Sequence, residues 1–172
     1  HTHTVVLPAT GSQDGYIDNG TLGDNLTWTL DRSGKLTISG TGFMHQCELE
    51  SQVPWAAYRD QIVTVVIGEG ITSVGNNAFY GCWKLEEVSL PNSLEAVYPY
   101  AFYGCKNLKS VTLSDNVVMV GNYAFYLCES METLDLGEGV GMLGECAFDM
   151  CRSLTDIIFP ASVSTISSYA FR

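Results

Sequence analysis

The sequence has few basic residues and no long apolar run, and each shortage excludes a class of function. Eight Lys and Arg stand against 19 Asp and Glu among 172 residues, so the formal net charge is −11. A chain this acidic repels the phosphate backbone, which excludes nucleic acid as a partner. No apolar stretch approaches the roughly 20 residues of a membrane-spanning helix, so the sequence also predicts no membrane span.

Catalytic and cofactor signatures are also missing. Outside the first three residues the chain has a single histidine, His45, and it contains no Gly-x-Ser-x-Gly elbow and no phosphate-binding glycine loop. Acidic residues are frequent in the last third of the chain, but they fall at different points of the sequence pattern and are expected to form a solvated surface: Glu132, Asp135, Glu138, Glu145 and Asp149. The sequence therefore predicts no enzyme, no metal site and no cofactor.

What the chain does have is a repeat of 23 residues. Its clearest marker is a recurring Ala-Phe pair: Ala78-Phe79, Ala101-Phe102, Ala124-Phe125, Ala147-Phe148 and Ala170-Phe171. Other apolar columns keep the same step, among them Val65, Val88, Val111, Leu134 and Ile157. Apolar columns in register over five units predict a solenoid, in which stacked coils supply a core that no single coil has.

Each unit predicts two extended stretches and a turn. Val88-Ser89-Leu90 alternates apolar and polar residues, which is the period of a half-buried strand. A second extended stretch covers 94–97, and the apolar spacing of three in Phe102, Cys105 and Leu108 favours a short helical or 3-10 turn. Parallel pairing between coils and the handedness of such connections predict a right-handed, mostly β solenoid of the α/β class. Its parallel sheet is expected on the concave face, with the helical turns opposite.

The four cysteines that obey the 23-residue step are Cys82, Cys105, Cys128 and Cys151. Zinc ligands come as close pairs that converge on a point, whereas these thiols would form a line along the stack. We therefore expect a ladder of buried free thiols that behave as small apolar side chains. Cys47 lies outside this register, and a disulfide within the N-terminal segment is left open for it.

These units resemble the BspA-like leucine-rich repeats of bacterial surface and secreted proteins. The resemblance covers 62–172 and is carried by the pattern Leu85-x-x-Val88-x-Leu90-Pro91-x-Ser93-Leu94-x-x-Val97-x-x-x-Ala101-Phe102-x-x-Cys105. It implies a non-catalytic, secreted or cell-surface module for adhesion, with an extracellular or host protein as its partner. Residues 20–61 similarly resemble the N-terminal hairpin cap often found before such repeats.

The two ends are expected to differ. Residues 1–19 are rich in Thr, Gly and Asp and predict a flexible leader, and the cap at 20–61 contains Pro54-Trp55, whose indole would cover the open core of the first coil. No sequence that resembles a C-terminal cap follows Phe171. We therefore expect the chain to be part of a longer multidomain protein.

Two surfaces compete as the binding site. The first is the concave strand face, where solenoids generally hold partners, and its candidate residues are Glu87, Ser89, Ser110, Thr112, Thr133, Asp135 and Asp156. The second is a row of tyrosines on the opposite face, Tyr80, Tyr103 and Tyr126, which could stack on sugar rings or only pack between coils. A structural spacer without a ligand is the third possibility.

Overall fold

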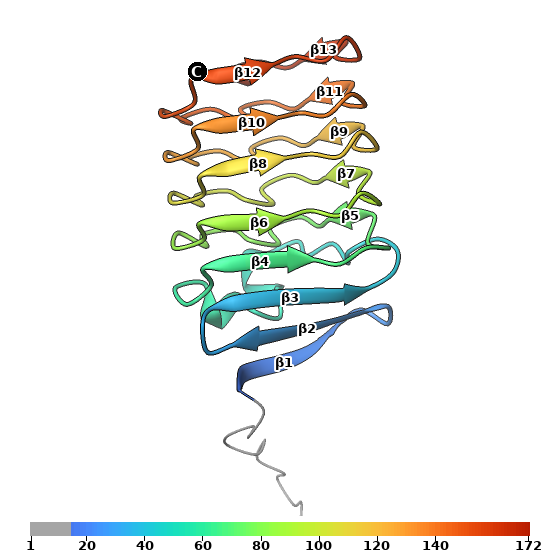
Figure 1. Ribbon diagram of the computed structural model, residues 1–172, viewed down its shortest axis with the longest axis vertical. Helices are drawn as coiled ribbons and strands as arrows, with labels where there is room; N and C mark the ends of the chain where they lie inside the picture. Colours follow the sequence, from blue (N-terminus) through green and yellow to red (C-terminus); the bar gives the residue numbers. More distant parts are fainter. Residues whose placement is uncertain (1–14) are drawn as a thin grey trace, which may run out of the picture.

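The computed structural model describes residues 15–172, which form a stack of coils with the N-terminal strands at one end (Figure 1). The strands are β1 (Tyr16–Leu22), β2 (Leu26–Asp31), β3 (Lys35–Gly40), β4 (Thr64–Ile67), β5 (Ser73–Val74), β6 (Glu87–Ser89), β7 (Ala96–Val97), β8 (Ser110–Thr112), β9 (Met119–Val120), β10 (Thr133–Asp135), β11 (Met142–Leu143), β12 (Asp156–Ile158) and β13 (Thr165–Ile166). Two 3-10 helices, η1 (Glu50–Gln52) and η2 (Ala56–Tyr58), precede β4. None of the described helices is long and apolar enough to cross a bilayer.

The longer strand of each coil lies on one side of the stack and runs parallel to its neighbours (Figure 1). Leu134 of β10 pairs with Val111 of β8 and with Ile157 of β12, so partners in the sheet are members of one sequence column. β4 pairs with β6 in the same way, while β6 and β8 belong to separate ladders. Where these two strands begin, the N–H of Lys109 donates to the carbonyl of Glu86 at 3.2 Å. The parallel solenoid predicted from the 23-residue step is confirmed.

A second parallel sheet lies beside the first and consists of the two-residue strands. Its order is β13-β11-β9-β7-β5, and Val97 pairs with both Val74 and Val120. Each of these strands lies within the second extended stretch expected in its unit: β7 covers Ala96–Val97 of the expected 94–97. They are short because the turn that follows takes the chain away from the sheet after two residues.

The return segment of each coil forms isolated turns instead of helices. The N–H of Cys105 donates to the carbonyl of Phe102 three residues earlier, at 3.2 Å, which is a 3-10-type bond. The N–H of Phe102, in contrast, donates to Ala124 of the next coil at 2.7 Å, and Gly104 donates to Tyr126 at 2.8 Å. Because alternate N–H groups bond to the neighbouring coil, no continuous helix can form here.

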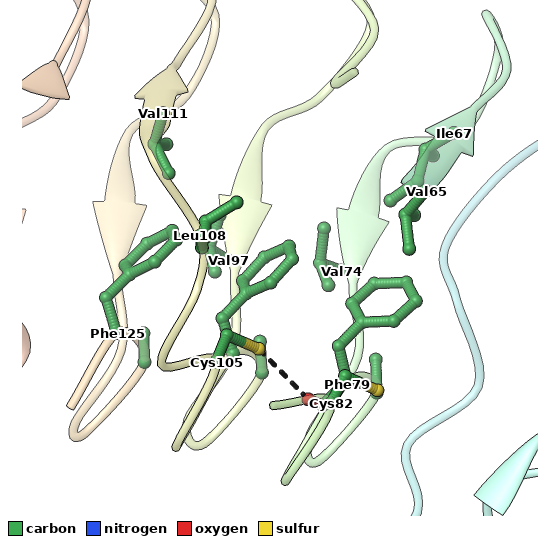
Figure 2. Close-up of a cluster of buried hydrophobic side chains, with 14 of the residues drawn as sticks. Val65, Ile67, Val74, Phe79, Cys82, Val97, Cys105, Leu108, Val111 and Phe125 are labelled. Carbon is green, nitrogen blue, oxygen red and sulfur yellow. Dashed lines mark hydrogen bonds between the residues drawn. The ribbon is translucent and has the colours of Figure 1, made fainter. Parts of the chain in front are cut away.

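Phenylalanine side chains stack along the axis of the core. Phe79, Phe102, Phe125 and Phe148 are buried, with ring centroids 5.0 to 5.2 Å apart. The close-up shows the ring of Phe79 beside Val74 of one sheet and Val65 of the other (Figure 2). Each ring thus packs against the coil before and the coil after its own, which is the contact that a solenoid core requires.

The cysteine column forms a ladder of free thiols beside the phenylalanines, as predicted. The Sγ atom of Cys105 donates to the carbonyl of Phe79 in the preceding coil at 3.3 Å (Figure 2), and Cys128 and Cys151 make the same bond at 3.3 and 3.2 Å. Burial raises the pKa of Cys82 and of Cys151 to about 12. Cys47 is also free and buried, so no disulfide holds the N-terminal segment.

The N-terminal hairpin continues the stack. β2 and β3 pair antiparallel, and β3 then pairs parallel with β4, with Leu36 opposite Val65 and Ile38 opposite Ile67. Trp55 follows η1 and is 1% exposed, and its Nε1 donates to the carbonyl of Ala78 at 2.7 Å. Its ring stacks on Phe79 at a centroid distance of 5.8 Å, so the indole covers the first coil as expected.

The N-terminal boundary differs from the expected one. Residues 1–14 of the expected leader lie outside the described residues, but 16–19 belong to β1 and not to a flexible segment. β1 pairs antiparallel with β2, and the hydroxyl of Tyr58 donates to the Asp18 carboxylate at 2.6 Å. The free edge of β2 therefore orders a stretch whose polar composition alone favours a loop.

Candidate functional site

The outward-pointing residues of β4, β6, β8, β10 and β12 form a continuous surface, which we call the strand face. All seven residues predicted for the binding site are exposed on it: Glu87, Ser89, Ser110, Thr112, Thr133, Asp135 and Asp156. The ladder aligns Ser110 and Thr133 with Asp156 in one row, and the next row holds Thr112, Asp135 and Ile158. Parallel pairing without a register shift brings residues from three coils side by side.

A cavity of about 380 Å³ opens where β8, β10 and β12 end and their turns begin. We call it the acidic cavity, and it is lined by Val111, Thr112, Thr133, Leu134, Asp135, Gly137, Glu138, Asp156, Ile158 and Pro160. Four of the predicted residues take part in it, whereas Glu87, Ser89 and Ser110 lie elsewhere on the strand face. The structure thus divides the predicted surface into a cavity and a flatter region.

Sequence reasoning missed the turn residues that complete this cavity. Gly137, with φ of +65°, comes two residues after Asp135, and Glu138 follows at the rim. A Cβ on Gly137 would lie 2.8 Å from the Leu113 carbonyl oxygen, so glycine lets this turn sit close to the preceding coil. The sequence indicates this turn through one column of the repeat, in which Gly137 lies between Ser114 and Pro160 of the adjacent coils and lacks a side chain.

The carboxylates of the acidic cavity have no basic partner in the described chain. The two ion pairs within residues 15–172 are Lys109–Glu86 and Arg172–Asp149, and neither involves the cavity. Asp135 accepts a hydrogen bond from the N–H of Gly137 at 2.9 Å, which fixes the direction of its carboxylate. Asp156 accepts only from the hydroxyl of its neighbour Thr155, at 3.2 Å. No cluster of three metal-ligating side chains occurs among the residues that the structure describes.

The predicted sugar platform is part of a cluster of five tyrosines. Tyr80, Tyr103 and Tyr126 stack in one row with centroids 4.6 and 5.0 Å apart, and Tyr100 stacks on Tyr123 at 5.2 Å. All three platform residues are half-buried, and burial together with the neighbouring phenols raises the pKa of Tyr103.

This stacking limits what the tyrosines can bind. Both faces of the Tyr103 ring are covered, by Tyr80 on one side and Tyr126 on the other. A sugar ring stacks on an open aromatic face, whereas this row presents ring edges and hydroxyl groups. The tyrosine cluster therefore resembles packing between coils more closely than a binding platform.

Comparison with known proteins places the chain in a family. Residues 56–172 match the BspA type leucine-rich repeat region in six copies, which is more than half of the chain. The chain belongs to this family of BspA-type leucine-rich repeat proteins. Repeats of this kind are protein-interaction modules, and the family and fold are generally non-catalytic. A search of curated proteins found no match.

Solved structures of bacterial leucine-rich repeat proteins share the fold. A leucine-rich repeat protein of T. pallidum is 26% identical with a TM-score of 0.64, over 88% of this chain and 66% of that one. One from Eubacterium ventriosum is 18% identical (TM-score 0.56; 90% and 63% covered). A leucine-rich cell surface protein from Faecalibacterium prausnitzii is 22% identical (0.54; 96% and 52%). The chain therefore spans between about half and two thirds of these proteins.

Proposed function

We propose that this chain is a non-catalytic extracellular module that binds a protein through its strand face, on a bacterial surface or within a larger secreted protein. The observation that carries the proposal is the strand face itself, where exposed polar residues from successive coils lie in register and lead into a cavity. The family supports a protein partner. A neighbour described as a cell surface protein supports the extracellular setting.

The composition of the strand face sets how a partner would bind. Its exposed positions are mostly small polar or acidic residues, and it lacks the Trp, Tyr and Arg side chains that dominate binding energy at most interfaces. A stable interface buries about 800 Å² on each partner. We therefore expect the partner to lie across several coils and to gain affinity from many modest contacts.

Charge reversal on the strand face tests this proposal. The double variant Glu87→Lys/Asp135→Lys should lower the adhesion of protein-coated beads to cultured epithelial cells and to purified matrix proteins at least tenfold. The control variant Glu95→Lys/Glu145→Lys makes the same charge change at exposed positions near β7 and β11, away from this face. Equal adhesion of the two variants would contradict the proposal.

Sugar binding at the tyrosine cluster is the weaker proposal. Its support is the row of half-exposed phenol groups of Tyr80, Tyr103 and Tyr126. On a glycan array, the variant Tyr80→Ala/Tyr126→Ala should lose every signal that the wild type gives if this proposal holds. A chain that binds neither glycans nor proteins in these assays would be left with the role of a spacer.

A further inference from the structure

The acidic cavity has an apolar wall as well as carboxylates. Ile158 of β12 is 83% exposed and lines the cavity, together with Val111, Leu134 and Pro160. An exposed isoleucine next to a hollow offers a partner apolar area to cover, which a flat polar surface does not. The occupant should therefore combine an apolar surface with a charge.

The carboxylates determine the sign of that charge. The register pairs Thr133 with Asp156 and Asp135 with Ile158, so the two aspartates lie diagonally on adjacent strands. With strands about 4.8 Å apart and about 3.3 Å per residue, their Cα atoms are about 8 Å apart. One guanidinium or ammonium group between them can bond to both carboxylates. Glu138 adds a third negative charge at the rim, and no Lys or Arg lines the cavity.

The shape of a basic side chain matches this combination. Lysine and arginine carry a long aliphatic stem and a charged end, and the stem commonly covers apolar surface while the charge stays at a polar site. In the acidic cavity the stem would lie against Ile158, and the charged end would reach Asp135 and Asp156. Arginine has the further advantage that its planar group bonds to two carboxylates in fixed directions.

We infer that the acidic cavity is the subsite for a lysine or arginine side chain of the partner, carried on an extended segment next to an apolar residue. This inference rests on the proposed function, because it names the chemistry of the partner at the same face. The net charge of −11 attracts a basic partner over a long range. The cavity then determines where one of the partner's basic side chains binds. The partner is thus a basic protein segment and not a neutral or acidic one.

Short peptides test the cavity directly. The probe is a fluorescent heptapeptide of alternating arginine and valine, and the matched control peptide has citrulline in place of arginine, which keeps the shape and removes the charge. Binding is measured by anisotropy in about 0.15 M salt, and the site is located from amide shifts in 15N spectra. We expect the arginine peptide to shift residues of β8, β10 and β12, and the citrulline peptide to bind at least tenfold more weakly.

A matched pair of variants separates the cavity from general acidity. Asp135→Asn/Asp156→Asn removes two charges from the cavity and keeps the side-chain shape, including an oxygen that can accept from the Gly137 N–H. Glu95→Gln/Glu145→Gln removes the same charge from exposed positions elsewhere. The cavity variant should bind the arginine peptide at least fivefold more weakly, and the control variant less than twofold. Equal weakening, or equal binding of the citrulline peptide, would overturn the inference.

The outcome also distinguishes this inference from the proposed function. Peptide binding that depends on Glu87 and ignores the cavity variant would reject the cavity and keep the strand face as the binding surface. Peptide binding at the cavity, together with cell and matrix adhesion that the strand-face charge reversal leaves unchanged, would keep the subsite and reject the proposed function.

Discussion

The two ends of the coil stack differ in how their apolar columns are covered. At the N-terminal end the hairpin and Trp55 cover the core, so Ile67 is 3% exposed and Val74 is fully buried. In the last coil the corresponding columns are open, with Phe159 46% and Ile166 53% exposed. The same kind of residue in the same position of a coil thus contributes a different amount of buried surface at the two ends.

This difference shows where the stability of the fold comes from. Leu143 and Ile166 belong to one column, one coil apart, and pair in the same parallel ladder, yet Leu143 is fully buried. Leu143 lies between two neighbouring coils, whereas Ile166 has a neighbouring coil on one side only. Burial is therefore a property of neighbouring coils, and each coil depends on two neighbours for its full share of the hydrophobic effect.

The largest expected effect is at the covered end. Replacing a buried aromatic residue with alanine costs about 3–5 kcal/mol, and Trp55→Ala also removes the hydrogen bond to Ala78. Phe171→Ala, at the other end, removes a ring that stacks on Phe148 alone among the axial rings and should cost about 1–2 kcal/mol. Urea unfolding followed by circular dichroism measures both values. Similar costs for the two variants would show that the ends are equally covered in solution.

A pair within one column sharpens the same comparison. Leu143→Ala creates a cavity between two coils and should cost about 2–4 kcal/mol. Ile166→Ala removes a side chain that is half exposed, so the cost should stay below about 1 kcal/mol. The two free energies of unfolding come from the same urea titrations. A cost for Ile166→Ala as large as that for Leu143→Ala would mean that something covers β13.

Thiol reactivity compares a cysteine near the C-terminal end of the stack with cysteines in its interior, and it needs no change to a core residue. Cys105 and Cys128 are fully buried, whereas Cys151 is partly accessible. With an aromatic disulfide reagent near pH 8, Cys151 should react at least tenfold faster than the interior thiols, which must wait for local opening.

The pH dependence of this reaction follows from the raised pKa of Cys151. Its pKa is about 12 in the folded chain, because burial disfavours the thiolate. The reactive thiolate fraction therefore rises about tenfold per pH unit between pH 7 and 10, and the rate should rise with it. Cys151→Ser should abolish the fast phase. A fast phase that survives this substitution would place the reactive thiol elsewhere.

Much of the fold could be predicted because the repeat converts sequence spacing into spatial neighbours. Once residues 23 apart stack, Val111, Leu134 and Ile157 must be partners in one sheet, as the ladder has them. The same argument placed the cysteine ladder and the exposed rows of the strand face. The 23-residue step alone is enough to predict these features.

Features outside strict repetition could not be predicted in this way. β1 forms because β2 offers a free edge, which the polar composition of residues 16–19 does not reveal. Asp149 was expected in solvent, but it takes the position of Tyr126 in the next coil and is fully buried, where Arg172 pairs with it at 3.1 Å. Gly137 lines the acidic cavity and has Ser114 and Pro160 as its counterparts in the adjacent coils, but the spacing alone does not predict a hollow there.

The smallest expected effect concerns the turn residue that follows Tyr80, Tyr103 and Tyr126, and that follows Asp149 in the next coil. This position is Gly81 and Gly104 in earlier coils and Leu127 and Met150 in later ones, and all four have φ between 60° and 72°. Left-handed backbone costs a side-chain-bearing residue about 1 kcal/mol, so Gly104→Ala should destabilise the chain by about that amount. Leu127→Gly should recover part of the same cost, reduced by the loss of its half-buried side chain.

Gly141→Ala is the control for these turn variants, because this glycine lacks a positive φ and a Cβ there would meet its nearest atoms at an ordinary 3.8 Å. It should be neutral or stabilising by about 0.5 kcal/mol, since alanine restricts the unfolded chain. Thermal unfolding of the three variants resolves the order, with Gly104→Ala least stable. If Gly104→Ala and Gly141→Ala unfold at the same temperature, the positive φ at residue 104 has no measurable cost for alanine. The earlier and later turns would then differ in side-chain burial alone.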